Sequence, residues 1–309
     1  MKMIEINGLT KTFKKRKSKE SKEKKIIALD SINLTIDKGE IFGLIGPNGA
    51  GKTTFLKILS TVILPDEGTA FIDGHNVVDD STIIKNKVSL LAGEFVRSLY
   101  WRLTGRENLK FFASLRNIWN PDERIDELID LFGLKSHENE LVMKYSTGMK
   151  HKLALAAGLL SDPPVVFLDE PLIGIDTVTA FEIKKIIKKD LKYKTIIWTS
   201  HNLNEIEEMC DRISLINNGR IALQGNPKKL MEDYWGYEKI LLVCNNPKPF
   251  EVLKGVKIKG DVVEIETKNT HNVFLEIMEI AKKKKIEVKE IKTLKPTLEE
   301  IFMKVINDA

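Results

Sequence analysis

An apolar segment, Ile41–Ile45, runs directly into a glycine-rich loop that ends in a lysine and two threonines. The loop consists of Gly46, Pro47, Asn48, Gly49, Ala50, Gly51, Lys52, Thr53 and Thr54. Two glycines, a lysine and a hydroxyl residue at this spacing form the pattern of a phosphate-binding loop. Glycines let backbone N–H groups curl around phosphates, and the helix expected at Phe55–Ser60 points its positive end at them. A tight glycine turn without a ligand is the alternative interpretation.

A second motif contains the acidic residues that nucleotide hydrolysis requires beside a phosphate-binding loop. The apolar run Val165–Leu168 reads as a buried strand and ends in two carboxylates, Asp169 and Glu170. A strand that ends in acids places them at the carboxyl edge of a parallel sheet, beside the phosphate-binding loop. We expect Lys52 to contact the β- and γ-phosphates of ATP, and the Thr53 hydroxyl and Asp169 to hold Mg²⁺. Glu170 is expected to orient and deprotonate the attacking water.

The order of predicted elements indicates an α/β fold. Short apolar strands alternate with helices such as Thr177–Leu191, which implies a mostly parallel sheet covered on its faces. Residues of about 97–160 read as an inserted helical subdomain, with helices at Asn108–Asn117 and Glu123–Phe132. After Gly225 the pattern changes to that of a small α+β domain. Its predicted strands are Lys239–Val243, Val252–Lys257, Val262–Thr267 and Ile286–Leu294, and its predicted helices are Asn272–Ala281 and Leu298–Ile306. The predicted domains are therefore 1–225 and 226–309.

The net charge of +5 is concentrated in one polar segment, Lys14–Lys25, which carries eight Lys and Arg residues against two Glu. A nucleic-acid-binding protein would spread its basic residues over a broad face, so no nucleic-acid partner is expected. The segment is interpreted as a solvated loop, with attraction to anionic lipid head groups as the alternative. Cys210 and Cys244 have no metal-like spacing and are expected to be reduced. With no signal-peptide core and no apolar run of spanning length, we expect a cytoplasmic location.

Further motifs resemble those of ATP-binding-cassette (ABC) proteins, in the family's order, over about residues 4–225. Tyr145-Ser146-Thr147-Gly148-Met149 resembles the family's signature motif, and Gly174-Ile175-Asp176 is similar to its D-loop. His201 resembles the switch histidine that contacts the γ-phosphate. Phe13 stands where the family carries an aromatic that stacks on adenine, although it could simply pack.

The resemblance implies a dimer. In the family, the signature serine and the following backbone N–H groups bind the γ-phosphate held by the other subunit. Ser146 and Gly148 match those positions, whereas Thr147 and Met149 replace the commonest glycine and glutamine. The position of the family's Q-loop glutamine is occupied by Glu94, a possible Mg²⁺ ligand that adds negative charge, unless the alignment has slipped and Glu94 is a surface acid. One chain would then hold half of two sites, in a homodimer or with a closely related second ATPase subunit.

The stretch Gly93–Leu109 and the tail Pro296–Phe302 resemble one exporter branch of the family, which contains ATP-binding subunits of multidrug, antibiotic and sodium-ion exporters. Their permeases are separate chains, so this resemblance implies a peripheral subunit on the cytoplasmic side of the membrane. Tyr100 and Trp101 would line the groove for the permease or pack within the helical subdomain. The alternative functions are a non-transport ABC ATPase in nucleic-acid maintenance, translation or cofactor assembly, and a P-loop kinase. A kinase would not need Ser146-Thr147-Gly148 or His201.

Overall fold

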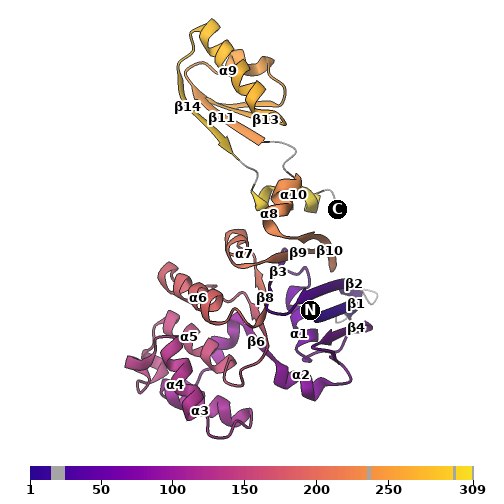
Figure 1. Cartoon of the computed structure of the whole chain (residues 1–309), viewed down its shortest axis with the longest axis vertical. Coiled ribbons are helices and arrows are strands. Elements are labelled where there is room, and N and C mark those ends of the chain that lie inside the picture. Colours follow the sequence, from indigo (N-terminus) through magenta and orange to yellow (C-terminus); the bar gives the residue numbers. More distant parts are fainter. Residues whose placement is uncertain (15–24, 235–237, 295–296, 308–309) are drawn as a thin grey trace, which may run out of the picture. The chain divides into compact units, whose positions relative to one another are not determined.

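The computed structural model describes residues 1–14, 25–234, 238–294 and 297–307, without the side chains of 92–94, 233–234, 238 and 306–307. It divides into two compact units, Met1–Gln224 and Gly225–Ala309 (Figure 1). Most of the predicted basic loop, residues 15–24, lies outside the described residues. Within the described residues, no helix combines the length and the apolar composition needed to cross a bilayer.

In chain order, the first three elements of unit 1 are strands, and its helices follow from α1 onward. Its strands are β1 (Lys2–Lys14), β2 (Lys25–Asp37), β3 (Ile41–Ile45), β4 (Glu67–Ile72), β5 (His75–Asn76), β6 (Val88–Ala92), β7 (Val165–Asp169), β8 (Thr195–Ser200), β9 (Arg212–Asn217) and β10 (Arg220–Gly225). Its α-helices are α1 (Lys52–Leu59), α2 (Ser81–Lys87), α3 (Gly105–Leu115), α4 (Asp122–Leu131), α5 (Thr147–Gly158), α6 (Thr177–Asp190) and α7 (Leu203–Met209). Three 3₁₀ turns complete it: η1 (Gly93–Ser98), η2 (Lys135–His137) and η3 (Val142–Lys144).

The central sheet of unit 1 has the strand order β10-β9-β3-β8-β7-β6. The pairs from β9 through β3, β8 and β7 to β6 are parallel. Every residue of β3, β7 and β8 is buried, as expected of strands covered on both faces. Because parallel strands end at one edge, Ile45 lies beside Ser200, and Asp169 lies beside Thr199. The loops that follow β3, β7 and β8 therefore converge, and the predicted α/β fold is confirmed.

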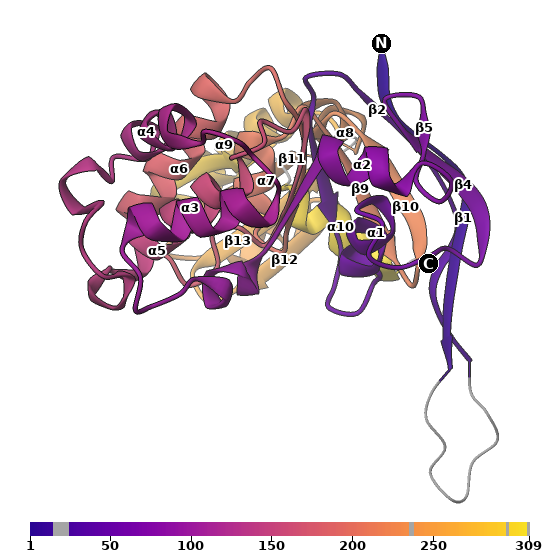
Figure 2. The ribbon, with the colours of Figure 1, turned by 90° about the horizontal axis from the view of Figure 1, so that it is seen from below.

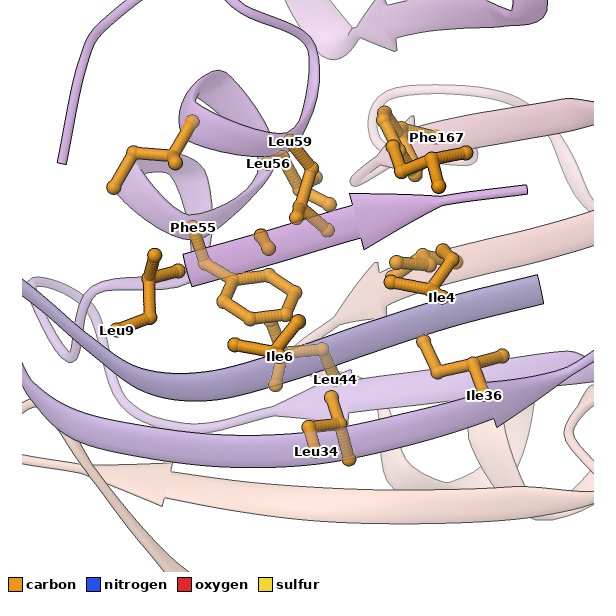
Figure 3. Close-up of a cluster of buried hydrophobic side chains, with 14 of the residues drawn as sticks. Ile4, Ile6, Leu9, Leu34, Ile36, Leu44, Phe55, Leu56, Leu59 and Phe167 are labelled. Atoms are coloured by element: carbon orange, nitrogen blue, oxygen red, sulfur yellow. The ribbon is translucent and has the colours of Figure 1, made fainter. Parts of the chain in front are cut away.

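A second sheet, β2-β1-β4-β5, is antiparallel and shares its apolar core with α1. Figure 3 shows Phe55 and Leu56 of α1 among side chains from β1, β2 and β3. Phe55 and Leu56 are fully buried. Each such side chain contributes about 1.5–3 kcal/mol when it is removed from water. The phosphate-binding loop is therefore followed by a helix that packing holds in place.

Helices α3, α4 and α5 pack on one another and lie on the far side of unit 1 from the antiparallel sheet (Figures 1 and 2). Thr104 and Glu107 form a reciprocal capping box at the start of α3. The side chain of the buried Asn108 accepts a hydrogen bond from the backbone N–H of Tyr100 and donates to its carbonyl oxygen. These contacts hold the segment before α3 against the helix. The helices predicted at 108–117 and 123–132 are confirmed as α3 and α4.

Unit 2 contains the antiparallel sheet β12-β13-β11-β14 and the helix α9, which share one apolar core. Its elements are α8 (Pro227–Tyr234), β11 (Glu238–Cys244), η4 (Lys248–Val252), β12 (Val256–Lys259), β13 (Val262–Thr267), α9 (Thr270–Lys284), β14 (Val288–Leu294) and α10 (Leu298–Asn307).

The strand predicted at Val252–Lys257 is wrong over its first four residues, 252–255. Residues Lys248–Val252 form the 3₁₀ turn η4 with Phe250 fully buried, and β12 begins only at Val256. Gly255 lies between them with φ +76°, a left-handed conformation that interrupts extended chain. The end of η4 and the bend at Gly255 therefore replace the first four residues of the predicted strand.

Candidate nucleotide site

The loop Gly46–Gly51 joins β3 to α1, as the sequence predicts. Gly49 and Gly51 have φ of 81° and 112°, in the left-handed region that favours glycine. A Cβ on Gly51 would also collide with the carbonyl oxygen of Ala28 and lie 2.9 Å from Leu29 Cδ2. No described side chain caps α1, so the first N–H groups of this helix remain available to an anion.

Lys52 lies inside the curve of this loop. Its Nζ donates hydrogen bonds to the carbonyl oxygens of Gly46, at 2.6 Å, and Pro47, at 3.3 Å. The residue is only 7% exposed, and its burial lowers the pKa of the ammonium group while Glu170 and Asp169 oppose that shift. A buried cation next to unpaired helix N–H groups suits a multiply charged anion such as a polyphosphate.

Asp169 ends β7 and receives hydrogen bonds on both carboxylate oxygens. The Thr53 hydroxyl donates to Oδ2 at 2.9 Å, and the Thr199 hydroxyl donates to Oδ1 at 2.6 Å. Thr53 and Asp169 are both predicted from the sequence as Mg²⁺-binding residues, whereas Thr199 is not. The sequence does show a hydroxyl residue, Thr199, near the end of an apolar strand. It does not show that this strand pairs with β7 and so brings Thr199 beside Asp169.

Glu170 follows directly with φ +54°, which is uncommon for a residue other than glycine. Its Oε2 lies 2.9 Å from Nδ1 of His201, and the His201 side chain is 63% exposed. His201 comes directly after β8, two residues beyond Thr199, the neighbour of Asp169 in the parallel register. Three sequence-predicted residues, Asp169, Glu170 and His201, therefore meet at one edge of the sheet.

A cavity of about 730 Å³ opens in front of these groups. It is lined by residues 48–54 of the loop and by Asp169, Glu170, Ile26, Ala28, Lys57, Arg97 and Ile173. Phe13 is not among the described lining residues. It is exposed and pairs with the lining residue Ile26 across β1 and β2, with Lys11 Nζ 5.7 Å from the centre of its ring.

Ser146 and Gly148 begin α5 and do not belong to the described lining of this cavity. Ser146 is the exposed N-cap residue, and its hydroxyl accepts a hydrogen bond from Met149 N at 3.1 Å. Gly148 is buried against α6, where an added Cβ would come within 2.5 Å of Thr179 Oγ1. Thr179 in turn is held by Asp176, the N-cap residue of α6. The segments that resemble the signature motif and the D-loop are therefore packed together.

Three further residues that the sequence singled out are Glu94, Tyr100 and Trp101. The backbone of Glu94 belongs to η1, but its side chain lies outside the described part of the structure, so its role stays a prediction. Tyr100 and Trp101 are each about half exposed. Tyr100 packs edge-on against Phe111, with 4.5 Å between ring centres, and Lys150 Nζ lies 5.4 Å from the Trp101 ring. Both aromatic rings thus combine packing within the helical layer with an exposed face.

Among the described residues, no group of three or more His, Cys, Asp or Glu side chains could hold a metal ion. Mg²⁺ does not need such a group, because it is commonly bound by one or two carboxylates together with water and substrate phosphates. Thr53 and Asp169 place a hydroxyl oxygen and a carboxylate oxygen side by side, and Mg²⁺ prefers oxygen donors.

Comparison with known proteins gives a consistent result. The family model described as "ABC transporter" matches residues 29–173. The ABC transporter ATP-binding protein NatA of Bacillus subtilis is 34% identical over 234 residues, which cover 74% of this chain and 92% of NatA. The daunorubicin resistance ATP-binding protein DrrA3 of Streptomyces coeruleorubidus is 30% identical over 292 residues, which cover 91% of this chain and 92% of DrrA3.

Among solved structures, a dimeric ATP-binding cassette in a post-hydrolysis state with ADP and Pi is similar in fold. Its TM-score is 0.62 and its identity 26%, over 72% of this chain and 98% of that one. An ABC transporter A family member of Arabidopsis thaliana is 34% identical over 72% of this chain, but the match covers only 24% of that longer protein.

Proposed function

This chain belongs to the ABC transporter family of ATP-binding proteins, and from that premise we propose that it hydrolyses Mg–ATP to drive a separate membrane permease, in an exporter. The observation that carries the proposal is the convergence of Lys52, Thr53, Asp169, Glu170 and His201 at one edge of the sheet. The similarity to NatA, a transporter ATP-binding protein, and to DrrA3, a daunorubicin resistance ATP-binding protein, favours this function over a non-transport ABC ATPase.

The phosphates of ATP would occupy the cavity in front of the loop 46–54. Lys52 Nζ, which now bonds to loop carbonyls, is placed to exchange those bonds for the β- and γ-phosphates. The backbone N–H groups at the start of α1 would complete the cradle. Thr53 and Asp169 would hold Mg²⁺. When bound, the ion would neutralise negative charge on the phosphates.

Glu170 is the proposed general base and His201 its partner. The left-handed turn at Glu170 and the 2.9 Å contact to His201 set the direction of this carboxylate at the rim of the cavity. A carboxylate in that position can accept the proton of an attacking water. His201 can both orient the Glu170 carboxylate and contact the γ-phosphate. The roles of Phe13, as an adenine-stacking residue, and of Glu94, as a Mg²⁺ ligand, remain parts of the same proposal.

The active unit is proposed to be a dimer, of two copies or of this chain with a closely related subunit. Ser146 and Gly148 lie away from the described lining of their own chain's cavity, at the N-terminus of α5. Free N–H groups at a helix N-terminus bind anions. In a dimer they would therefore contact the γ-phosphate held by the other subunit.

We assign ATP binding to residues 1–225 and an accessory role to 226–309. The half-exposed Tyr100 and Trp101 are the proposed contact with the permease, since exposed aromatic rings suit protein interfaces. The chain would then act as a peripheral subunit on the cytoplasmic side of the membrane.

The test uses Glu170→Gln, which removes proton acceptance but retains size and hydrogen bonding. Loss of a general base costs about 10²- to 10⁴-fold in rate, while ATP binding should survive because Lys52 and Thr53 remain. Two trapped ATP molecules should then hold the dimer closed, because a ligand that binds one state better stabilises it. Size-exclusion chromatography should show monomers without nucleotide and dimers with Mg–ATP.

Adding Ser146→Arg to this variant should abolish the dimer, and Ser114→Arg, an exposed serine on α3, is the matched control that should not. A monomer with bound ATP, both alone and in the presence of the permease, would contradict the composite site. Full activity of Glu170→Gln would contradict its role as base.

A further inference from the structure

Thr199 lies at the centre of the site without facing the cavity. It is the fifth residue of β8, fully buried, and its neighbours in the parallel register are Asp169 on β7 and Leu44 on β3. Its hydroxyl donates to Asp169 Oδ1 at 2.6 Å and accepts from the backbone N–H of Glu170 at 3.0 Å. A hydroxyl has one proton to donate and two lone pairs, so both bonds form together.

The first bond sets the orientation of the Asp169 carboxylate. Because Oδ1 is occupied by Thr199, Oδ2 is the oxygen turned toward Thr53 on α1, at 2.9 Å. A carboxylate held at both oxygens cannot rotate about its terminal bond without breaking a hydrogen bond. Thr199, on the neighbouring strand β8, therefore determines which carboxylate oxygen of Asp169 faces the phosphate-binding loop.

The second bond supports the backbone of Glu170. The φ of +54° at this residue belongs to a region that side chains other than glycine rarely occupy, and such residues persist only where their surroundings hold them. Both the hydroxyl and, at 3.2 Å, the carbonyl oxygen of Thr199 accept from Glu170 N. The turn that directs Glu170 toward His201 is thus tied to β8.

We propose that Thr199 is a positioning residue of the ATP site, whose single hydroxyl aligns the Mg²⁺-binding carboxylate of Asp169 with the backbone of the general base Glu170. The proposal rests on the function assigned above. Thr199 acts only through these two residues and touches neither nucleotide nor metal. Residues that orient a metal ligand in this way commonly change metal affinity or activity about 10- to 100-fold when they are removed.

A buried threonine can also serve stability alone, and the same strand contains a matched example. Thr195 is fully buried as well, and its hydroxyl accepts from a backbone N–H, that of Gly39, at 2.9 Å. It lies at the other end of β8 and bonds to no carboxylate of the site. Replacement of either threonine by valine retains the shape and removes one hydroxyl from the same strand.

The experiment compares Thr199→Val, Thr199→Ser and Thr195→Val in the full chain. Thr199→Val should lower kcat about 10- to 100-fold, whereas the ATP affinity measured in a chelator should stay within about threefold of the parent's because the phosphate-binding loop is intact. It should also reduce the gain in ATP affinity that Mg²⁺ produces, measured by calorimetry with Mg²⁺ and with a chelator. Thr199→Ser should restore both, and Thr195→Val should resemble the parent in both.

Thermal unfolding without nucleotide measures the structural contribution, which should be similar for the two valine variants. A parent-like kcat and Mg²⁺ dependence in Thr199→Val would overturn the inference, as would equal losses in Thr195→Val or no recovery in Thr199→Ser. A parent chain that neither binds nor hydrolyses Mg–ATP would overturn the proposed function, and this inference with it. An active parent with an unaffected Thr199→Val would overturn this inference alone.

Discussion

Gly148→Ala should separate the starts of α5 and α6 because the structure leaves no room for a methyl group between them. The added Cβ would lie 2.5 Å from Oγ1, 2.8 Å from Cγ2 and 3.1 Å from Cβ of Thr179. Thr179 cannot simply turn away, because its Oγ1 donates to Asp176 Oδ2 at 2.8 Å and its backbone N–H bonds to Asp176 Oδ1 at 2.9 Å. The clash must therefore be relieved by loss of the Thr179 hydroxyl bond or by movement of backbone.

Overpacking of this kind costs about 1–3 kcal/mol. Alanine is the better helix former by up to about 1 kcal/mol, and Gly148 is only the second residue of α5, so the gain is smaller than in a helix interior. The net loss in unfolding free energy should be about 0–3 kcal/mol. Thr179→Ala removes Oγ1 and Cγ2 and leaves the tolerable 3.1 Å contact, so the two substitutions together should show a favourable coupling of about 0.5–3 kcal/mol.

The assay is a double-mutant cycle in urea unfolding, combined with ATP binding and ATP-induced dimerisation of each variant. Gly148→Ala should weaken dimerisation and hydrolysis while leaving the monomer's affinity for ATP unchanged, because the cavity in front of Lys52 does not include Gly148. Adding Thr179→Ala should recover part of the dimerisation. Gly148→Ala at least as stable as the parent, together with zero coupling to Thr179→Ala, would refute the reasoning.

Lys52→Ala should abolish most ATP binding and nearly all hydrolysis, since it removes the cation held inside the loop, and near-normal turnover would contradict the phosphate-loop assignment. Glu94→Ala should leave ATP binding largely intact but slow hydrolysis or uncouple it from the permease; unchanged activity and coupling would mean a surface acid. Asp66→Asn should lower stability at neutral pH by less than about 1 kcal/mol, because Asp66 is more than a third exposed. A hydrogen bond from Lys11 holds the pKa of Asp66 at about 2. Ionised Asp66 therefore stabilises the fold above about pH 4. The difference in unfolding free energy between the parent and Asp66→Asn should disappear as the pH falls through about 2. Unfolding measured across that range checks this, and a difference that stays constant with pH would contradict it.

Local motifs made much of the site predictable. The spacing of Gly46, Gly51, Lys52 and Thr53 dictates a strand, a loop and a helix because the glycine conformations and the helix start are set by neighbouring residues. Asp169 and Glu170 were recognisable because they end a short apolar run. The same local signals are weaker for Val88–Ala92, a strand of the central sheet that was not predicted from the sequence. They failed at residues 252–255, where burial of Phe250 and the left-handed Gly255 produce a turn.

The amino-acid sequence by itself thus determined which chemical groups are present and which of them follow a strand or begin a helix, because these properties depend on residues close together in the chain. Only the tertiary structure decided which groups meet. The order β3-β8-β7 brings Thr199 against Asp169 and places His201 against Glu170, some thirty residues apart along the chain. Strand order depends on how whole helices and sheets bury their apolar faces, and no local pattern encodes it. For the same reason Gly148 was identified as part of a motif, whereas its need to be glycine follows from the position of Thr179.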